Sequence, residues 1–467
     1  MHRMFEDLLS NSDDDEGSSF HWSKVDENEW PIHLEQYRNR IVVRFCDYTG
    51  EFVRFVREAS AYRLWSKSEG SKLFIDIEME QDALPELISS FQNLPYKVII
   101  EDLAQSVFES YPDKQERKMR ATTEKEINEP TYQITEDIIR ISKEEGFHAA
   151  SEIFFKDYRP LETIQAWLDL LVQAYPELVE RQYLGATPEG RKYDHIHIRS
   201  PNGEHKDKRT ILITGGTHAR EWISVSTSLY AIYEMVNFYS QYPGLDAALR
   251  LDFIIAPLMN PDGYAYTWSN DRLWRKNRQP TEFSGCVGID IDHSFDFHWT
   301  HSSDWACGED YSGEYAFEAK ESWLWYQHMN TTKFHHNIWG YVDLHSYSQD
   351  ILYPYAYSCD DQPRDEENLI ELAYGIAKAI RQHSGVYYDV LPACIDRDSD
   401  LIPDLGAGTA LDYMYKYGAI WAFQLKLRDS GNHGFLLPAK YIEPVGLETW
   451  EGIRYFIRFI LSDDRYS

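Results

Sequence analysis

Apolar and polar residues alternate near the N-terminus in a pattern that predicts a small folded unit. Three short segments show the alternation or the apolar run typical of strands, at 41–45, 73–77 and 98–100. Two segments with helical spacing lie between them, at 52–64 and 84–91. Strands interleaved with two helices predict a compact α+β domain over residues 33–111.

The pattern changes after about residue 151 and predicts one large α/β domain that extends to residue 467. Ile164, Trp167, Leu168 and Leu171 share one face of a predicted helix, which Pro176 closes. Strand-like runs then alternate with helical ones, at 195–198, 210–214, 253–258, 339–344 and 420–425. This alternation favours a largely parallel or mixed sheet flanked by helices, with functional groups at the strand ends.

Two segments lack the pattern of a folded core. Residues 1–32 are acidic, rich in Ser and aperiodic, which indicates a mobile tail. Residues 112–150 are strongly charged and contain few large apolar side chains before Ile134. We interpret them as a charged helix or exposed connector, with a protease-sensitive segment as the alternative.

Composition narrows the class of protein. The 467 residues carry a formal net charge of −31, which argues against nucleic acid as a partner. Aromatic residues make up 15% of the chain, so core material is ample and global disorder is excluded. No stretch reaches the ~18 unbroken apolar residues that a membrane span requires. We therefore expect a folded, acidic protein with no membrane span. We also expect a monomer, which the composition does not decide.

The segment ILITGGTHAREWI, residues 211–223, contains half of a possible metal site. Its apolar run ends in two glycines and leads to His218 and Glu221. A His-x-x-Glu pair is common by chance, and both residues could instead lie on the first turn of a surface helix that begins near Trp222. A second strand-like run ends at Leu344 and is followed by His345. Two His and one Glu at strand ends leave a fourth tetrahedral position open, as in catalytic zinc sites.

Asp290 follows a short Gly-Ile segment and completes this hypothesis. Its carboxylate would accept the second ring N–H of His218 and fix the tautomer of that imidazole.

Six motifs in order resemble a known family: GGTHAREWIS, NPDGYAYTW, DRLWRKNR, CVGID, DLHSYSQ and KLRDSGNHGF. From about Phe155 to Ile460 the chain resembles the zinc carboxypeptidases of the carboxypeptidase A type. The N-terminal region resembles the activation domain that precedes these enzymes as zymogens. This resemblance implies a mixed eight-stranded sheet flanked by helices, and one bound Zn²⁺.

The resemblance also assigns roles to individual residues. His218, Glu221 and His345 match the zinc ligands, and Arg275 matches the arginine that stabilises an oxyanion beside the metal. The remaining matches are Arg220 and Tyr347 to subsite residues, Arg272 to a surface arginine of the groove, and Leu411 to the specificity pocket.

Five cysteines and one sequon bear on the compartment. Cys286 and Cys307 match a family disulfide. Cys359 and Cys394 bracket a predicted helix over about 368–382, and we interpret them as a second disulfide, with two buried thiols as the alternative. Cys46 is expected to be an unpaired core residue.

Asn330 begins an Asn-Thr-Thr glycosylation triplet. The cysteines and the triplet favour a secreted or vacuolar protein, as the family resemblance does. The first residues carry no basic and then apolar signal peptide, so a leader is expected from sequence upstream.

Two functions of the family are altered in this chain. Lys426 occupies the position of the glutamate that exchanges protons with zinc-bound water, and an ammonium at pH 7 cannot accept a proton. Asp292 and His293 replace the Asn-Arg pair that grips a C-terminal carboxylate. The tyrosine that caps the substrate is also missing, and Asp404 lies nearest to its expected position.

These changes predict a catalytically inactive carboxypeptidase homologue with a binding or structural role toward a protein or peptide ligand. In this combination the chain resembles a fungal branch regarded as inactive and associated with cell-wall organisation, in the vacuole or outside the cell. The alternatives are an active carboxypeptidase with altered specificity, or an inhibitory or chaperone-like N-terminal domain over a vestigial groove.

Overall fold

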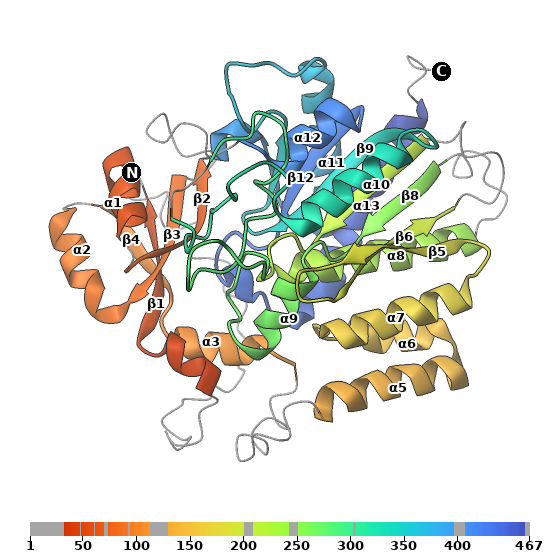
Figure 1. The fold of residues 1–467 in the computed structure, drawn as a ribbon, viewed down its shortest axis with the longest axis horizontal. Coiled ribbons are helices and arrows are strands. Elements are labelled where there is room, and N and C mark those ends of the chain that lie inside the picture. Colours follow the sequence, from red (N-terminus) through yellow and green to blue (C-terminus); the bar gives the residue numbers. More distant parts are fainter. Residues whose placement is uncertain are drawn as a thin grey trace.

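The computed structural model describes residues 32–462, except for 47, 60, 70–72, 92–93, 113–128, 200–208, 242–250, 302–304 and 397–406. The chain forms two sheets, each with helices packed on it (Figure 1). Almost all of the predicted acidic tail, residues 1–32, lies outside the described residues, and so does Asp404.

The smaller sheet belongs to the N-terminal domain and has the antiparallel order β2-β3-β1-β4. Its strands are β1 (Arg40–Cys46), β2 (Arg63–Glu69), β3 (Leu73–Glu80) and β4 (Tyr96–Ile100). Helices α1 (Gly50–Glu58) and α2 (Leu84–Ser90) cover one face, and α3 (Leu103–Ser110) follows β4. Apolar side chains of α1, β1 and β3, among them Phe52, Val43 and Ile77, form the core of this domain.

The predicted helix over residues 52–64 is wrong in its last part. Helix α1 ends at Glu58, Ala59 is extended, and β2 begins at Arg63. Trp65 of β2 is buried on the opposite face of the small sheet, in the core of the large domain. Leu64 of β2 instead packs on the same small core as α1, so its apolar position continued the helical pattern of that helix.

The larger sheet has eight strands in the order β11-β10-β12-β9-β7-β8-β6-β5. Parallel pairs join β10 to β11, β12 to β9, β9 to β7 and β7 to β8, and the other pairs are antiparallel. The prediction of a mixed eight-stranded sheet is thus confirmed. The strands are β5 (Val179–Ala186), β6 (Lys192–Ile198), β7 (Arg209–Gly215), β8 (Leu251–Ala256), β9 (Asn337–Ser346), β10 (Asp350–Tyr353), β11 (Asp389–Pro392) and β12 (Trp421–Leu427).

Helices lie on both faces of this sheet, as predicted (Figure 1). On one face, helix α13 (Ile442–Ser462) packs against both α8 (Trp222–Gln241) and α11 (Glu366–Ser384). Helix α10 (Lys320–Thr332) crosses in front of the sheet in Figure 1. The remaining α-helices are α6 (Phe147–Phe154), α7 (Leu161–Ala174), α9 (Pro261–Ser269) and α12 (Ala410–Tyr417).

The described part of the charged segment 112–150 is largely helical. Helix α5 (Glu129–Glu145) packs against α6 and α7 of the large domain. Ile138 of α5 is fully buried, and the hydroxyls of Thr135 and Thr163 lie 2.8 Å apart. The C-terminal half of this segment is therefore attached to the large domain.

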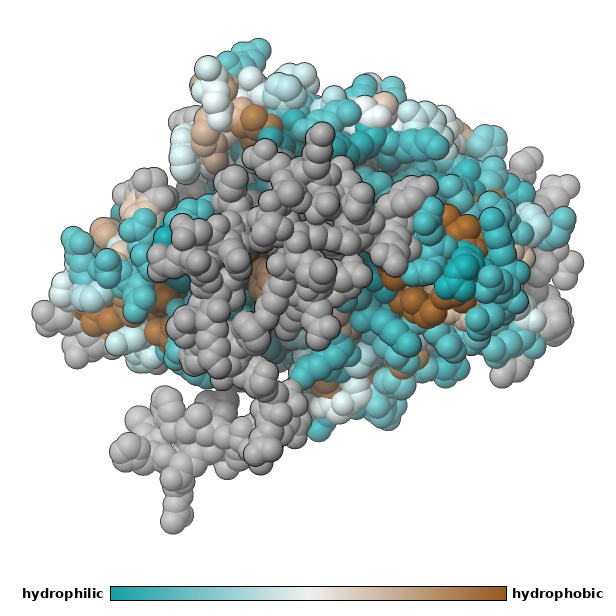
Figure 2. Space-filling view, turned by 90° about the horizontal axis from the view of Figure 1, so that it is seen from below, coloured by the Kyte–Doolittle hydropathy of each residue, from teal (hydrophilic) through white to brown (hydrophobic). Residues whose placement is uncertain are grey.

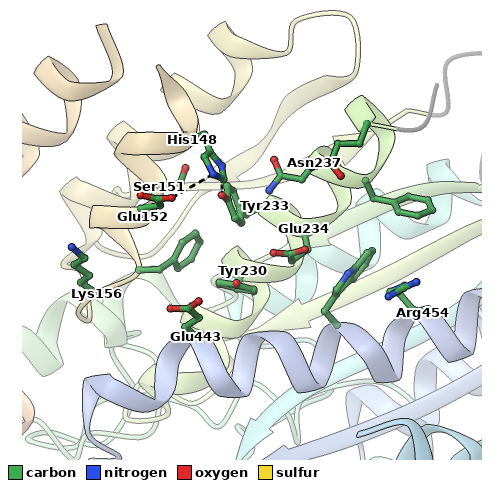
Figure 3. Close-up of a pocket in the computed structure, with 14 residues that line it drawn as sticks. His148, Ser151, Glu152, Lys156, Tyr230, Tyr233, Glu234, Asn237, Glu443 and Arg454 are labelled. Carbon is green, nitrogen blue, oxygen red and sulfur yellow. Dashed lines mark hydrogen bonds and ion pairs between the residues drawn. The ribbon is translucent and has the colours of Figure 1, made fainter. Parts of the chain in front are cut away.

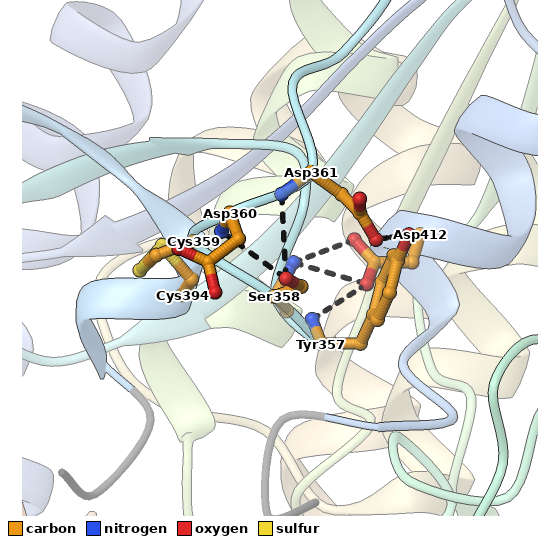
Figure 4. Close-up of a disulfide and its surroundings, with 8 residues drawn as sticks. Tyr357, Ser358, Cys359, Asp360, Asp361, Cys394 and Asp412 are labelled. Carbon is orange, nitrogen blue, oxygen red and sulfur yellow. Dashed lines mark hydrogen bonds between the residues drawn. A yellow bond between two sulfur atoms is a disulfide. The ribbon is translucent and has the colours of Figure 1, made fainter. Parts of the chain in front are cut away.

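Both predicted disulfides are present, Cys286–Cys307 and Cys359–Cys394. Near the second one, the Asp412 carboxylate accepts hydrogen bonds from the backbone N–H groups of Ala356 and Tyr357 (Figure 4). Cys46 takes part in neither disulfide and is half-buried, rather than a core residue.

Hydrophilic residues dominate the described part of the face shown in Figure 2, and apolar residues form separate patches there. Within the described part of the chain, none of the helices combines the length and the apolar character that a membrane crossing requires.

Candidate metal centre

The loop between β7 and α8 presents two of the three predicted metal ligands. Its sharp turn needs glycine, because Gly216 has a φ of 64° and a side chain on Gly215 would meet the hydroxyl of Ser228 at 2.1 Å. The loop then carries His218, and Glu221 lies immediately before α8. This geometry explains why an apolar strand is followed by two glycines.

The three predicted ligands converge on one point. The Nδ1 atom of His218 lies 2.8 Å from Oε1 of Glu221, and Nδ1 of His345 lies 3.0 Å from Oε2 of the same carboxylate. The two Nδ1 atoms are 3.2 Å apart, and all three residues are buried. Two imidazole nitrogens and a carboxylate that face a common point form a donor set that suits zinc.

Two buried carboxylates orient the imidazoles from behind. The second ring nitrogen of His218 lies 3.1 Å from Oδ1 of Asp290, and that of His345 lies 3.2 Å from Oδ2 of Asp343. Asp290 was predicted in this place, whereas Asp343 was not. The Asp290 contact is a hydrogen bond that fixes the tautomer of His218 and leaves its other nitrogen available to a metal, whereas the Asp343 contact is an ion pair without hydrogen-bond geometry.

The charges around the cluster keep its carboxylates ionised. Burial raises the pKa of Glu221, but the imidazoles of His218 and His345 outweigh it and hold this pKa well below its usual range. Burial likewise raises the pKa of Asp290, and Arg275 and His218 reverse the shift. The guanidinium of Arg275 donates two hydrogen bonds to Oδ2 of Asp290, at 2.8 and 3.2 Å. Arg275 therefore lies beside the cluster, where the family resemblance puts it.

Lys426 lies on β12, the strand next to β9, and is the register partner of His345. On its other side it pairs with Asp350 of β10. Its side chain is half-buried. The lysine predicted at the general-base position is thus next to one of the three converging residues.

The residues at the predicted carboxylate clamp make local contacts. The carboxylate of Asp292 accepts hydrogen bonds from the backbone N–H of Ala410 at 3.2 Å and the amide of Gln424 at 3.5 Å. The Asp292 carboxylate also belongs to a group of possible metal-binding atoms with Asp343 and His345. A ring nitrogen of His293 lies 3.1 Å from the carbonyl oxygen of Ala407. Leu411, predicted in the specificity pocket, is buried in α12.

The N-terminal domain packs against the large domain beside these residues. The hydroxyl of Tyr347 donates to Oδ2 of Asp76 at 2.7 Å, and the guanidinium of Arg44 donates to both oxygens of the same carboxylate at 2.7 Å. The Trp65 ring packs on Phe435 with centroids 5.3 Å apart. Tyr347, predicted as a subsite residue, therefore contacts the protein's own N-terminal domain.

The two other predicted groove arginines are buried. Arg220 donates to both oxygens of Glu309 and lies over the ring of Phe435. Arg272, predicted as a surface arginine of the groove, is 0% exposed in the full chain. It donates to the Ser110 hydroxyl at the end of α3 and lies over the Trp222 ring, so the N-terminal domain helps to cover it.

A surface cavity of about 860 Å³ lies elsewhere, between α6, α8 and α13 (Figure 3). Aromatic side chains such as Tyr230 and Trp450 line it together with Glu234 and Arg454. None of the predicted site residues lines this cavity. Asn330, the predicted glycosylation residue, is half-buried in the last turn of α10.

Comparison with known proteins agrees with this geometry. Residues 164–452 match the model of the zinc carboxypeptidase family. The chain therefore belongs to the zinc carboxypeptidase family. It is 47% identical to the inactive metallocarboxypeptidase ECM14 of Saccharomyces cerevisiae, over 92% of this chain and 94% of the relative. It is 38% identical to the inactive metallocarboxypeptidase ecm14 of Sclerotinia sclerotiorum, over 92% of this chain and 74% of the relative. These relatives confirm the prediction of an inactive homologue.

Two solved structures share the fold. Thrombin activatable fibrinolysis inhibitor superposes with a TM-score of 0.73 at 24% identity, covering 91% of this chain and 100% of that one. The carboxypeptidase A from Helicoverpa armigera gives a TM-score of 0.72 at 23% identity, covering 92% and 99%. Both similarities include the small N-terminal domain as well as the large sheet.

Proposed function

We propose that this protein is a pseudoenzyme that holds one zinc ion with His218, Glu221 and His345 and uses the adjacent groove for binding. The observation that carries this proposal is the register pairing of Lys426 with His345. An ammonium there has no lone pair with which to accept a proton from a water molecule on the metal. Zinc would act as an electrostatic anchor for ligand groups and for the loops that hold it.

The charges near the metal residues favour a ligand that differs from a peptide C-terminus. Asp292 and Asp343 add carboxylates close to His345. A carboxylate ligand would be repelled there, and the guanidinium fork that grips it in the family is replaced by His293. The ligand is therefore a protein or peptide segment that does not depend on a free C-terminal carboxylate. The chain acts as a monomer.

The compartment and biological role complete the proposal. Two disulfides favour an oxidising compartment, so the protein is secreted or vacuolar. In that compartment Asn330 carries a glycan. The family resemblance implies a role in organising the fungal cell wall.

Zinc analysis and a hydrolysis screen test this function. The purified chain is analysed for metal and assayed on peptides with varied C-termini, before and after limited proteolysis within residues 112–150. We expect one equivalent of zinc to be lost in His218→Ala, and hydrolysis by the wild-type chain to equal that of this variant. Hydrolysis by the wild-type chain above the His218→Ala background would refute the pseudoenzyme. Zinc content unchanged by His218→Ala would refute the ligand assignment.

A further inference from the structure

A second group of potential metal-binding side chains lies at the other end of the strands of the large sheet, away from His218, Glu221 and His345. His197 is near the end of β6, Asp252 is the second residue of β8, and His336 immediately precedes β9. His345 lies near the other end of β9. A strand rises about 3.3 Å per residue, so β9 separates the two groups by roughly 30 Å. The second group is therefore independent of the metal centre described above.

The distances in this group suit a tetrahedral metal ion. Nε2 of His197 lies 3.4 Å from Oδ2 of Asp252, and Nδ1 of His336 lies 4.0 Å from the same oxygen. Ligand atoms at the usual zinc distances of about 2.0–2.1 Å are about 3.3 Å apart when the geometry is tetrahedral. A metal ion therefore requires small movements of these side chains, of which only His336 reaches the surface.

Burial gives the group a reason to take a cation. Asp252 is 0% exposed, and a carboxylate in such a low-dielectric site attracts a cation more strongly than one in water. Two imidazoles face its Oδ2 atom, and the hydroxyl of Thr210 lies 3.1 Å from Nδ1 of His336. A metal ion would replace this hydroxyl as the partner of Nδ1.

A neighbouring pair of histidines increases the density of nitrogen donors. His195 lies on the same face of β6 as His197, and its ring centroid is 4.4 Å from that of His328 in α10. Among the described residues, neither ring nitrogen of His195 has a hydrogen-bond partner, although the side chain is buried. Four imidazoles and one carboxylate thus gather on one side of the sheet.

We propose that His197, Asp252 and His336 form a second site for a divalent transition metal, with zinc as the natural probe. Imidazole nitrogens select transition metals, whereas calcium and magnesium require mostly oxygen ligands. A metal there ties the end of β6 to the starts of β8 and β9. Its role is structural, because it cross-links three strands directly.

Zinc titration of the full-length chain tests this site. The His218→Ala background removes a ligand of the first centre, and the loss caused by His336→Asn then identifies the zinc of the second site, whatever the fate of the pseudoenzyme proposal. We expect about one equivalent in His218→Ala, and an affinity weakened at least 100-fold in His218→Ala/His336→Asn. His335→Asn in the same background is the matched control, because His335 is exposed and next in sequence. This control should bind as His218→Ala does.

Thermal unfolding with and without zinc provides a second measurement. Zinc should raise the Tm of His218→Ala and leave the Tm of His218→Ala/His336→Asn unchanged. Asp252→Asn in the same background removes the buried carboxylate ligand. Its Tm should respond to zinc as that of the His336→Asn variant does. The proposal is overturned if His218→Ala binds no zinc, or if its zinc affinity and Tm shift persist in the His336→Asn variant.

Discussion

Lys426 of β12 lies directly beside His345 of β9 in a parallel register. Paired residues on neighbouring strands are about 4.8 Å apart and direct their side chains to the same face of the sheet. The lysine therefore shares a face with a residue whose Nδ1 atom points into the metal cluster. Its ammonium cannot accept a proton from a water molecule in that cluster.

Restoring the glutamate alone should not restore hydrolysis. Lys426→Glu supplies a base worth about 10²–10⁴-fold in a complete site, but Asp292 and His293 still fail to hold a substrate carboxylate. We expect the peptidase rate of Lys426→Glu to equal that of His218→Ala. A measurable gain is expected only when Asp292→Asn and His293→Arg are added.

An exposed lysine provides the control for the change in charge. Lys416→Glu alters the net charge by the same amount on the outer side of α12 and should have no effect on hydrolysis. A gain of about 100-fold from Lys426→Glu by itself would mean that the lysine is the sole defect.

The contact between the N-terminal domain and the groove depends on the buried Asp76 carboxylate. Asp76→Asn breaks its pair with Arg44, and removal of one partner from a buried pair typically costs about 3–5 kcal/mol. Tyr347→Phe removes a single donor and should cost about 1–3 kcal/mol. Urea unfolding of the full-length chain measures both losses.

A double-mutant cycle shows whether these residues act together. We expect the losses in Asp76→Asn/Tyr347→Phe to fall short of the sum by about 0.5–3 kcal/mol, since the two residues share one hydrogen bond. Asp82→Asn, at an exposed position of the same domain, should leave stability unchanged. Strict additivity would contradict the contact between the two domains.

The strands that the sequence predicts are those with buried apolar runs. Strands β7, β8 and β12 are nearly all buried, and their runs are unmistakable. Strand β5 lies at the edge of the sheet with mostly half-exposed residues, so periodicity does not reveal it. Strands β10 and β11 have four residues each, which is too short for a pattern.

The site residues also differ in how far the sequence predicts them. His218 follows β7, His345 is the second-last residue of β9, and both match motifs, so the sequence leads to them. Asp343 could have been found too, because it lies two residues before His345 and on the same strand face. The pairing of Asp76 with Tyr347 could not, since it spans 271 residues and depends on how two domains dock.

The Cys359–Cys394 disulfide should contribute measurably to stability. It closes 35 residues of chain, and loop-closure entropy predicts a gain of about 3–4 kcal/mol. We expect Cys359→Ser/Cys394→Ser to lose roughly 2–4 kcal/mol in urea unfolding under oxidising conditions. Cys46→Ser, in neither disulfide, should change stability by less than about 1 kcal/mol. Equal losses in the two variants would contradict a stabilising role for the bridge.

Glu321 should make stability depend on pH between about 4 and 7. It is buried at the start of α10, where burial raises its pKa to about 7 although the amide of Asn277 donates to Oε2 at 2.8 Å. The nearby carboxylate of Asp262 raises this pKa further. Its Oε1 atom has no hydrogen-bond partner among the described residues, so it gains nothing from being charged.

The direction follows from proton binding in the two states. The unfolded side chain has a pKa of about 4.3, so between about pH 4.3 and 7 the folded chain binds a proton that the unfolded chain releases. This contribution to stability is complete below about pH 4.3 and is lost by about pH 7, a fall of roughly 3 kcal/mol. Glu321→Gln keeps an acceptor for Asn277 without a titrating group. The variant should therefore match the wild type at pH 4 and exceed its stability by this amount at pH 8.

Urea unfolding of both proteins at pH 4, 6 and 8 measures the difference between their free energies of unfolding. The contributions of all other titrating groups, including the buried Asp412, are the same in both proteins and cancel in this difference. Glu367→Gln, at an exposed position of α11, serves as the matched control and should follow the wild type at all three values. If Glu321→Gln and the wild type give parallel stability profiles, Glu321 is already ionised in the folded protein at neutral pH. In that case another group in the folded protein must compensate the charge of the Glu321 carboxylate.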